Sequence, residues 1–155
     1  MKTFVFDLDD TLLYKPYDTY DDIKQDFTLM YLLSQINSPK YLFTNATYAH
    51  ADISLKKLNI FNLLDMIFAR DTINLMKPDF HAFNHVHQRI KFNNVSFHNE
   101  YNNPDILFFD DRLENLETAK KFNWTTIYIG NEEKPDHVDY KFKNIILAIH
   151  YFLND

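Results

Sequence analysis

The segment FVFDLDDTL, residues 4–12, joins a short apolar run to three aspartates. An apolar run at residues 3–6 that ends in acids predicts a strand buried on both faces. Asp7 and Asp9 are two residues apart, so their side chains leave an extended chain on the same side. Because ligands of open α/β sheets bind beyond the carboxyl ends of the strands, this segment predicts the edge at which the chemistry takes place.

Four further apolar runs alternate with helical patterns along the chain. The strands that we predict are residues 41–43, 66–68, 106–109 and 126–129. The helices that we predict are residues 20–36, about 46–58, a helix that begins near residue 78, residues 112–122 and about 141–153. Residues 92–104, which are rich in Asn, indicate a loop. The alternation predicts one α/β domain over residues 1–155, with a three-layer Rossmann-like parallel sheet of about five strands and helices on both faces.

Two details of the predicted helices can be compared directly with a structure. The helix at 20–36 places Ile23, Phe27 and Met30 on one apolar face. Asn59 and Asn123 each follow a helical run in a chain with one glycine. Asn is the usual second choice for the left-handed residue that ends a helix, so we expect both to be C-terminal caps.

Composition excludes several classes of protein. Hydrophobic residues make up 46% of the 155 residues, which is ample for a core and argues against disorder. A net charge of −6 with no run of Lys or Arg disfavours nucleic acid as a partner. The absence of cysteine excludes disulfides, zinc–thiolate sites and cysteine nucleophiles. We expect a cytoplasmic chain with no membrane partner, because no apolar stretch is long enough to span a bilayer and an acid at position 7 comes too early for a signal peptide.

Polar residues at or near the ends of the predicted strands form the candidate site: Asp7, Asp9, Thr44, Lys77, Asp110 and Asp111. Carboxylates gathered at one edge repel one another, and a like-charged pair 4 Å apart costs about 4 kcal/mol at an effective dielectric of 20. A cation is needed to make the cluster tolerable. Oxygen ligands with open positions suit Mg²⁺ better than zinc or copper, and Lys77 supplies a second positive charge.

These residue types match the needs of phosphate-ester hydrolysis. Asp7, ionised at neutral pH, can attack phosphorus and form an aspartyl-phosphate. Asp9 can protonate the leaving oxygen and then accept a proton from the hydrolytic water. Thr44 and nearby backbone N–H groups can hold the phosphoryl oxygens, and Lys77 can neutralise the charge of the transition state.

Four segments resemble the motifs of the haloacid dehalogenase (HAD) superfamily: FDLDDTL at 6–12, FTN at 43–45, KPD at 77–79 and FDD at 109–111. The resemblance runs from residue 4 to about residue 148. It implies a Rossmann-like sheet, an aspartyl-phosphate mechanism and a phosphatase. It also implies Mg²⁺ bound by Asp7, the Asp9 carbonyl and Asp110, with Asp111 close by.

Within the superfamily, residues 44–51, 110–115 and 124–130 are similar to the pyrimidine 5′-nucleotidase group, which implies a nucleoside 5′-monophosphate as substrate. By this resemblance we expect the substrate-binding residues to be Thr44, Asn45, Lys77 and Arg112, although Arg112 stands where a serine is usual. Relatives in that group carry a helical cap between the first two motifs, whereas residues 14–38 have room for one helix.

An open site needs some other cover. Tyr14, Tyr17 and the loop predicted at 92–104 are candidate lid elements, and a second copy of the chain in a homo-oligomer is another source of a lid. His50, near the second motif, has two interpretations from the sequence: it stacks on a nucleobase, or it packs at the start of its helix.

Three alternative functions remain. The missing cap is typical of phosphatases that act on phosphoproteins or nucleic-acid ends, although a phosphorylated small molecule fits the composition better than a macromolecule. A phosphorylated signalling receiver also combines acids, Thr and Lys, but there the acidic pair comes first along the chain. A catalytically idle member of the fold, used for binding, conflicts with the intact set of acids and lysine.

Overall fold

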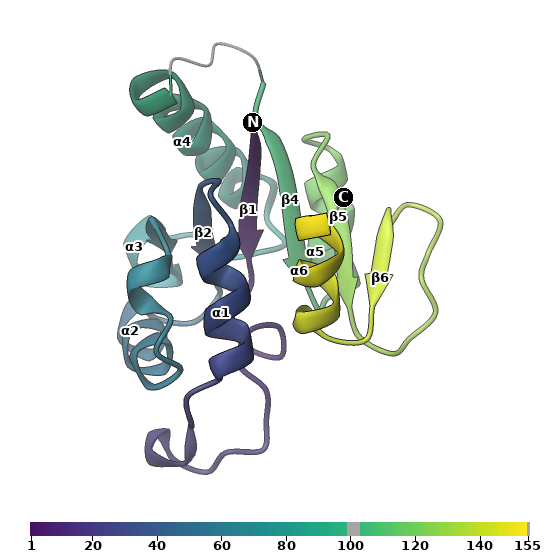
Figure 1. Ribbon diagram of the computed structural model, residues 1–155. Coiled ribbons are helices and arrows are strands. Elements are labelled where there is room, and N and C mark those ends of the chain that lie inside the picture. Colours follow the sequence, from purple (N-terminus) through teal and green to yellow (C-terminus); the bar gives the residue numbers. More distant parts are fainter. Residues whose placement is uncertain (99–102, 155) are drawn as a thin grey trace.

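The protein, described by a computed structural model over residues 1–98 and 103–154, is built on a parallel β-sheet (Figure 1). Within these ranges the sheet has six strands in the order β3-β2-β1-β4-β5-β6. The strands are β1 (Lys2–Phe6), β2 (Lys40–Phe43), β3 (Met66–Phe68), β4 (Asp105–Asp110), β5 (Thr125–Ile129) and β6 (Tyr140–Phe142). Every neighbouring pair is parallel, so all the carboxyl ends of the strands lie along one edge.

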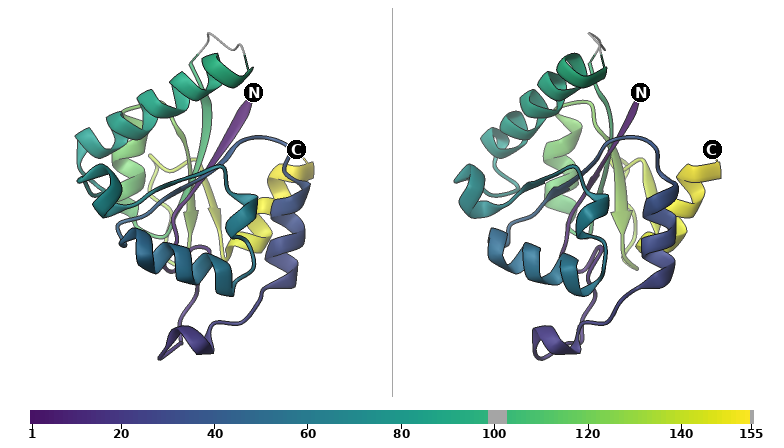
Figure 2. Two further views of the ribbon diagram at one scale, coloured as in Figure 1. Left: turned by 90° about the vertical axis from the view of Figure 1, so that its left-hand side faces the viewer. Right: turned by 60° about the vertical axis from the view of Figure 1, so that its left-hand side comes forward.

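Helices cover both faces of the sheet, which lies between them in Figure 2. One face carries α1 (Phe27–Gln35), α2 (Tyr48–Lys57) and α6 (Ile145–Asn154), and the other carries α4 (Phe80–His98) and α5 (Leu113–Lys120). Shorter helical turns are η1 (Tyr20–Asp22), η2 (Phe61–Leu63) and α3 (Arg70–Ile73). The three-layer Rossmann-like class predicted from the sequence is confirmed.

Alternate residues of each central strand enter two separate cores. In β1, Phe4 and Phe6 pack in the core beneath α1 and α6, whereas Val5 packs in the core beneath α4 and α5. In β4, Phe109 enters the first core and Phe108 the second. A side-chain period of two explains this division, and it also explains why these strands are apolar at almost every position.

The two asparagines predicted to end helices do so. Asn59 follows α2 with φ 61° and Asn123 follows α5 with φ 58°. These values lie in the left-handed region, in which Asn is tolerated better than most residues with a Cβ.

The helix predicted at 20–36 is wrong in its first half. Residues 20–22 form η1, and α1 begins at Phe27, with the Asp26 carboxylate accepting from the Leu29 N–H at 2.9 Å. Phe27 is 68% exposed, so it does not belong to the core face, which is instead Leu29, Leu32 and Leu33. The acids in this stretch serve as caps and turn residues, which compete with helix formation.

The loop predicted at 92–104 is also wrong over residues 92–98, because α4 continues through His98. Asn93 is buried in this helix and donates from Nδ2 to the Tyr41 hydroxyl at 3.3 Å. Packing against the start of β2 therefore overrides the low helix propensity of Asn. It also places this end of α4 at the amino edge of the sheet, so residues 92–98 are not a lid; residues 99–102 lie outside the described part of the chain.

The count of about five strands omitted β6, whose three residues continue the sheet beyond β5. The sequence pattern merged this short edge strand with the final helix. Within residues 1–98 and 103–154, no helix is both long enough and apolar enough to cross a membrane.

The buried aromatic cluster beneath α4 and α5 predicts that substitutions at two Phe positions differ widely in their effect on the free energy of unfolding. Phe83 is fully buried and its ring contacts those of Phe43, Phe108 and Trp124, so Phe83→Ala should lower the free energy of unfolding by about 3–5 kcal/mol. The matched control Phe27→Ala, at an exposed position, should change it by less than about 0.5 kcal/mol. Urea denaturation measures both, and equal losses would contradict the packing described above.

Candidate active site

Three adjacent strands bring the candidate residues together at the carboxyl edge of the sheet. Asp7 follows β1, Thr44 follows β2, and Asp110 is the last residue of β4. The Asp7 N–H donates to the Phe109 carbonyl and the Thr44 N–H to the Phe68 carbonyl, each at 2.9 Å. The sheet ladder therefore continues through the first residues of the site and holds their main chains rigidly.

Lys77 lies between two of the aspartates. Its Nζ donates to Asp7 Oδ1 at 2.8 Å and to Asp110 Oδ2 at 2.7 Å, and its side chain is 1% exposed. The ammonium group also lies 5.2 Å from the ring centre of Phe43 and 5.5 Å from that of Phe108. Burial acts to lower the pKa of Lys77, but the carboxylates of Asp110 and Asp7 outweigh it and the pKa is raised. Lys77 is therefore a permanent positive charge in the site.

Asn45 positions Lys77 by binding its main chain. The Asn45 amide donates from Nδ2 to the Lys77 carbonyl at 2.8 Å and accepts through Oδ1 from the Lys77 N–H at 2.7 Å. Lys77 belongs to the segment between α3 and α4, which has no strand to hold it. The two hydrogen bonds attach that segment to the loop after β2, and a contact between Asn45 and substrate stays a prediction.

Asp110 is fully buried and accepts hydrogen bonds at both carboxylate oxygens. Oδ1 accepts from the Arg112 N–H at 2.8 Å, and Asn115 Nδ2 lies 3.1 Å from Oδ1 and 3.0 Å from Oδ2. Asn115, in the first turn of α5, was not among the residues predicted from the sequence. The sequence offered little indication of this role for Asn115, since an Asn near the start of a helix is more often a local capping residue.

Asp7, Asp110 and Asp111 form the metal-binding candidate among the described residues, because each offers an oxygen within 4.8 Å of the others. Burial, then Asp110 and Asp111, raise the pKa of Asp7 against the opposing effect of Lys77, to about 7. Burial and the nearby charges of Asp110 and Asp10 raise the pKa of Asp111 to about 6. Lys77 thus does not balance the negative charge of the group, and oxygen ligands crowded in this way can hold a hard cation.

Asp9 lies apart from this group and binds a histidine. Its carboxylate, 39% exposed, places Oδ1 3.0 Å from His50 Nε2. His50 Nδ1 in turn lies 2.8 Å from the Tyr20 hydroxyl. Neither sequence interpretation of His50 included this contact, because residues 9 and 50 are brought together only by the fold.

The two tyrosines predicted as lid elements have different neighbours. Burial first, and then the Asp9 carboxylate, raise the pKa of Tyr17, which places Tyr17 beside the site. Tyr14 instead accepts a hydrogen bond at its hydroxyl from the Ile145 N–H at 3.1 Å, at the start of α6. Tyr17 remains a candidate lid residue, while Tyr14 is attached to a neighbouring helix.

A cavity of about 320 Å³ opens over these groups, lined by Asp7, Asp9, Asp10, Thr44, Asn45, Ala46, Lys77, Asp111, Arg112 and Asn115. Thr44 Oγ1 accepts from the Ala46 N–H at 3.0 Å, so the hydroxyl proton remains to be donated into the cavity. Arg112 is exposed at the rim, where Nη1 lies 3.5 Å from Glu114 Oε1. The structure thus brings all eight predicted site residues to one edge of the sheet.

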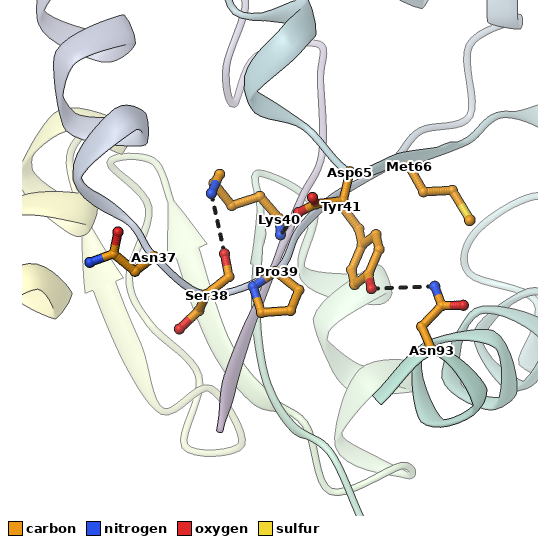
Figure 3. A pocket seen from close by; sticks show the side chains of 8 residues that line it. All are labelled: Asn37, Ser38, Pro39, Lys40, Tyr41, Asp65, Met66 and Asn93. Carbon is orange, nitrogen blue, oxygen red and sulfur yellow. Dashed lines mark hydrogen bonds between the residues drawn. The ribbon is translucent and has the colours of Figure 1, made fainter. Parts of the chain in front are cut away.

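A second cavity, of about 450 Å³, lies at the opposite edge of the sheet (Figure 3). Its lining comes from the start of β2, the start of β3 and the end of α4. Lys40 Nζ donates to the carbonyls of Ile36 and Ser38, at 2.7 and 3.2 Å, so its charge is directed at the main chain. Asp65 lines this cavity, but none of the aspartates of the candidate site does, so the cavity is separate from that site.

No protein-family model and no curated protein matches the sequence, but solved structures do. YfnB from Bacillus subtilis, described as a HAD hydrolase and bound to magnesium, has a TM-score of 0.68 and 18% identity over 88% of this chain and 59% of its own. The L-2-haloacid dehalogenase from Xanthobacter autotrophicus, with chloropropionic acid covalently bound, has a TM-score of 0.63 and 9% identity over 86% of this chain and 62% of its own. The L-2-haloacid dehalogenase RSc1362 has a TM-score of 0.62 and 17% identity, over 80% and 54%.

These similarities show that the chain has the HAD fold, as the motifs predicted. The chain spans 54–62% of the length of these three structures. The similarity is one of fold, since the identities are 9–18%.

The raised pKa of Asp7 predicts how stability depends on pH in metal-free protein. With a folded pKa of about 7 and an unfolded value of 3.8, Asp7 keeps a proton in the folded state that the unfolded state has released between those values. Its contribution to stability is therefore lost as pH rises through that window. Denaturation in EDTA should show Asp7→Asn gaining stability relative to the unchanged protein from pH 5 to pH 8. A difference that is constant across this range would contradict the raised pKa.

Proposed function

We propose that this protein is a Mg²⁺-dependent phosphomonoester hydrolase that works through an aspartyl-phosphate intermediate. The observation that carries the proposal is the arrangement around Asp7. The buried Lys77 ammonium group lies 2.8 Å from Asp7 Oδ1, and the carboxylates of Asp110 and Asp111 lie close to Asp7. Asp9, two residues further along the chain, contacts His50. This combination supplies a nucleophile, a charge that can neutralise phosphoryl oxygens, a cation site and a proton donor.

In the first step an Asp7 oxygen attacks phosphorus and forms the aspartyl-phosphate bond. The bond from phosphorus to the ester oxygen breaks, its electron pair leaves with that oxygen, and the proton of Asp9 neutralises it. Lys77 and the Thr44 hydroxyl stabilise the phosphoryl oxygens, since both groups face the cavity edge and each has a proton to donate.

In the second step water attacks phosphorus and gives its proton to Asp9. The bond between phosphorus and Asp7 breaks, its electron pair returns to the Asp7 carboxylate, and inorganic phosphate leaves. Asp9 is again protonated and Asp7 again ionised, so the protein returns to its starting state.

Mg²⁺ fits the residues present, with Asp7, Asp110, Asp111 and the Asp9 carbonyl as the residues that would hold it. When bound, it would neutralise phosphoryl charge and lower the pKa of Asp7, which keeps the nucleophile ionised at neutral pH. The raised pKa values of Asp7 and Asp111 support this assignment, because they report negative charge that the protein alone leaves unbalanced.

Dehalogenation is the second candidate, because two of the similar structures are haloacid dehalogenases. A halide leaves as a stable anion and needs no proton, so Asp9 with its histidine partner would have no task in the first step of that reaction. Phosphoryl transfer gives Asp9 a task in both steps, whereas dehalogenation gives it a task only in the second.

For the substrate, we propose a small phosphate ester, with nucleoside 5′-monophosphates as the first class to test. Residues 7–39, all within the described ranges, hold only η1 and α1 as helical elements, so no folded cap narrows the entrance from this segment. Arg112 at the rim is a candidate contact for the leaving group, with Thr44, Asn45 and Lys77 at the phosphate. A second copy of the chain could cover the opening.

Phosphate release tests this proposal. The substrates are p-nitrophenyl phosphate, a nucleoside 5′-monophosphate panel and a phosphoserine peptide, with and without Mg²⁺, and chloride release from 2-chloropropionate is measured in parallel. Asp7→Asn should lower turnover by roughly 10⁴-fold or more, because it removes the nucleophile. Thr44→Val should cost roughly 10²-fold through a lost oxyanion contact.

The control for these substitutions is Asp105→Asn, at the exposed amino end of β4, which should leave turnover unchanged. Turnover of the aryl ester and the peptide alone would indicate a macromolecular substrate. Chloride release without phosphate release would replace the proposal by dehalogenation, and a folded, Mg²⁺-binding protein with no turnover would indicate an idle binding module.

Mg²⁺ should also stabilise the folded protein. At a concentration one hundred times its dissociation constant, the ion adds about 2.7 kcal/mol, which corresponds to a rise of roughly 5–10 °C in Tm. Asp111→Asn should reduce that rise, whereas Asp105→Asn should not, because Asp105 lies at the amino end of β4 and Asp111 follows its carboxyl end. Differential scanning calorimetry measures the shift, and an equal response of all three proteins would contradict the assigned ligands.

A further inference from the structure

We infer that His50 is a positioning residue for Asp9 and that Tyr20 fixes the His50 ring for this task. The inference rests on the proposed phosphate-ester hydrolysis and adds residues that the reaction scheme above does not use. Three segments that are distant in the sequence meet here: the loop after β1, the first turn of α2 and the 3₁₀ turn η1. The contacts join Asp9 to His50 and His50 to Tyr20.

The first turn of α2 determines where His50 lies. Thr47 caps this helix, and its hydroxyl accepts from the His50 N–H at 3.3 Å. Thr47 follows directly on the loop that carries Thr44 and Asn45, so the histidine is attached to the phosphate-binding side of the site. The side chain is 21% exposed and points Nε2 at Asp9 Oδ1, 3.0 Å away.

Both nitrogens of the His50 ring have a partner. In the neutral tautomer with its proton on Nε2, the ring donates to Asp9 Oδ1 and accepts at Nδ1 from the Tyr20 hydroxyl, 2.8 Å away. The Tyr20 ring also contacts the imidazole, with 5.6 Å between ring centres. A histidine bound at both nitrogens keeps one tautomer and one ring orientation, as second partners do for metal-bound histidines.

Tyr20 is itself held by contacts within η1 and with α2. The Asp22 carboxylate accepts from the Thr19 N–H at 2.7 Å, which closes the turn, and Asp21 pairs with Lys57 Nζ at 2.7 Å. In Figure 1 this purple segment extends beyond the carboxyl ends of the strands, where the site lies. The segment between β1 and α1 therefore places Tyr20 against His50, which contacts Asp9.

The His50 contact restricts the Asp9 carboxyl group, which would otherwise rotate. The χ2 torsion of Asp is broad, and the side chain is 39% exposed, so water competes for both oxygens. The His50 contact engages Oδ1, and the Tyr17 side chain hydrogen-bonds the same carboxyl group. Without the His50 contact, the proton donor would spend part of its time in orientations that cannot reach the substrate.

This role predicts an effect that depends on the leaving group. An alkyl oxygen is a poor leaving group and needs the proton of Asp9 as its bond to phosphorus breaks, whereas p-nitrophenolate is stable as an anion. General acid catalysis contributes roughly 10²–10⁴-fold where it is needed. A histidine that merely stabilised the start of α2 would affect both substrates equally.

The test compares kcat/KM for ethyl phosphate and p-nitrophenyl phosphate with Mg²⁺ in the full chain. His50→Leu should lower the value for ethyl phosphate by roughly tenfold or more relative to that for p-nitrophenyl phosphate. His50→Gln, which can place an N–H near the Nε2 position, should restore most of the ratio. Tyr20→Phe keeps the ring and removes the hydroxyl. It should lower the ratio of the two kcat/KM values as His50→Leu does, but by a smaller factor.

The matched control is His85→Leu, at an exposed position in α4, which should leave the ratio unchanged. Circular dichroism and Tm confirm that each variant is folded. An equal loss on both substrates, or no loss, in a folded His50→Leu protein overturns the positioning role and leaves the proposed hydrolysis intact. Absence of phosphate release from both substrates in the unchanged protein overturns the hydrolysis and this inference with it.

Discussion

The structure of the site depends on one buried charge, the ammonium group of Lys77 between Asp7 and Asp110. Ion pairs buried to this degree persist only when every partner is held by further hydrogen bonds. Asn45 holds the main chain of Lys77, and Asn115 holds the carboxylate of Asp110. Because one positive charge cannot balance three crowded carboxylates, the same arrangement that retains the lysine also creates the demand for a cation.

Three reactive groups of the site are each held by a polar side chain from another part of the fold. The loop after β2 orients Lys77 through Asn45, α5 orients Asp110 through Asn115, and α2 orients Asp9 through His50. The orienting groups come from the same loops and helices that close the sheet. Contacts from neighbouring elements of the fold thus keep these reactive groups in place.

The errors in the sequence prediction have two physical causes. Acids near residues 18–26 support either a helix surface or helix caps, and only the packing of Leu29, Leu32 and Leu33 decides where α1 begins. The asparagines near the end of α4 have low helix propensity, yet burial and the bond from Asn93 to Tyr41 keep them helical. In both cases contacts with residues distant in the sequence outweighed the local helix propensity. The hydrophobic periodicity of the sequence carries no information about such contacts.

The sequence by itself determined the layers of the fold and the edge of the sheet that carries the acids. Apolar runs and helical patterns alternate at short range, and parallel strands necessarily place their carboxyl ends together. It also identified Asp7, Asp9, Thr44, Lys77 and Asp110, because each lies at or near the end of an apolar run in a recognisable motif. Only the tertiary structure decided which groups orient them. The contacts of Asn45, Asn115, His50 and Tyr20 with their partners join groups on different segments, and their geometry exists only once the fold has brought those segments together.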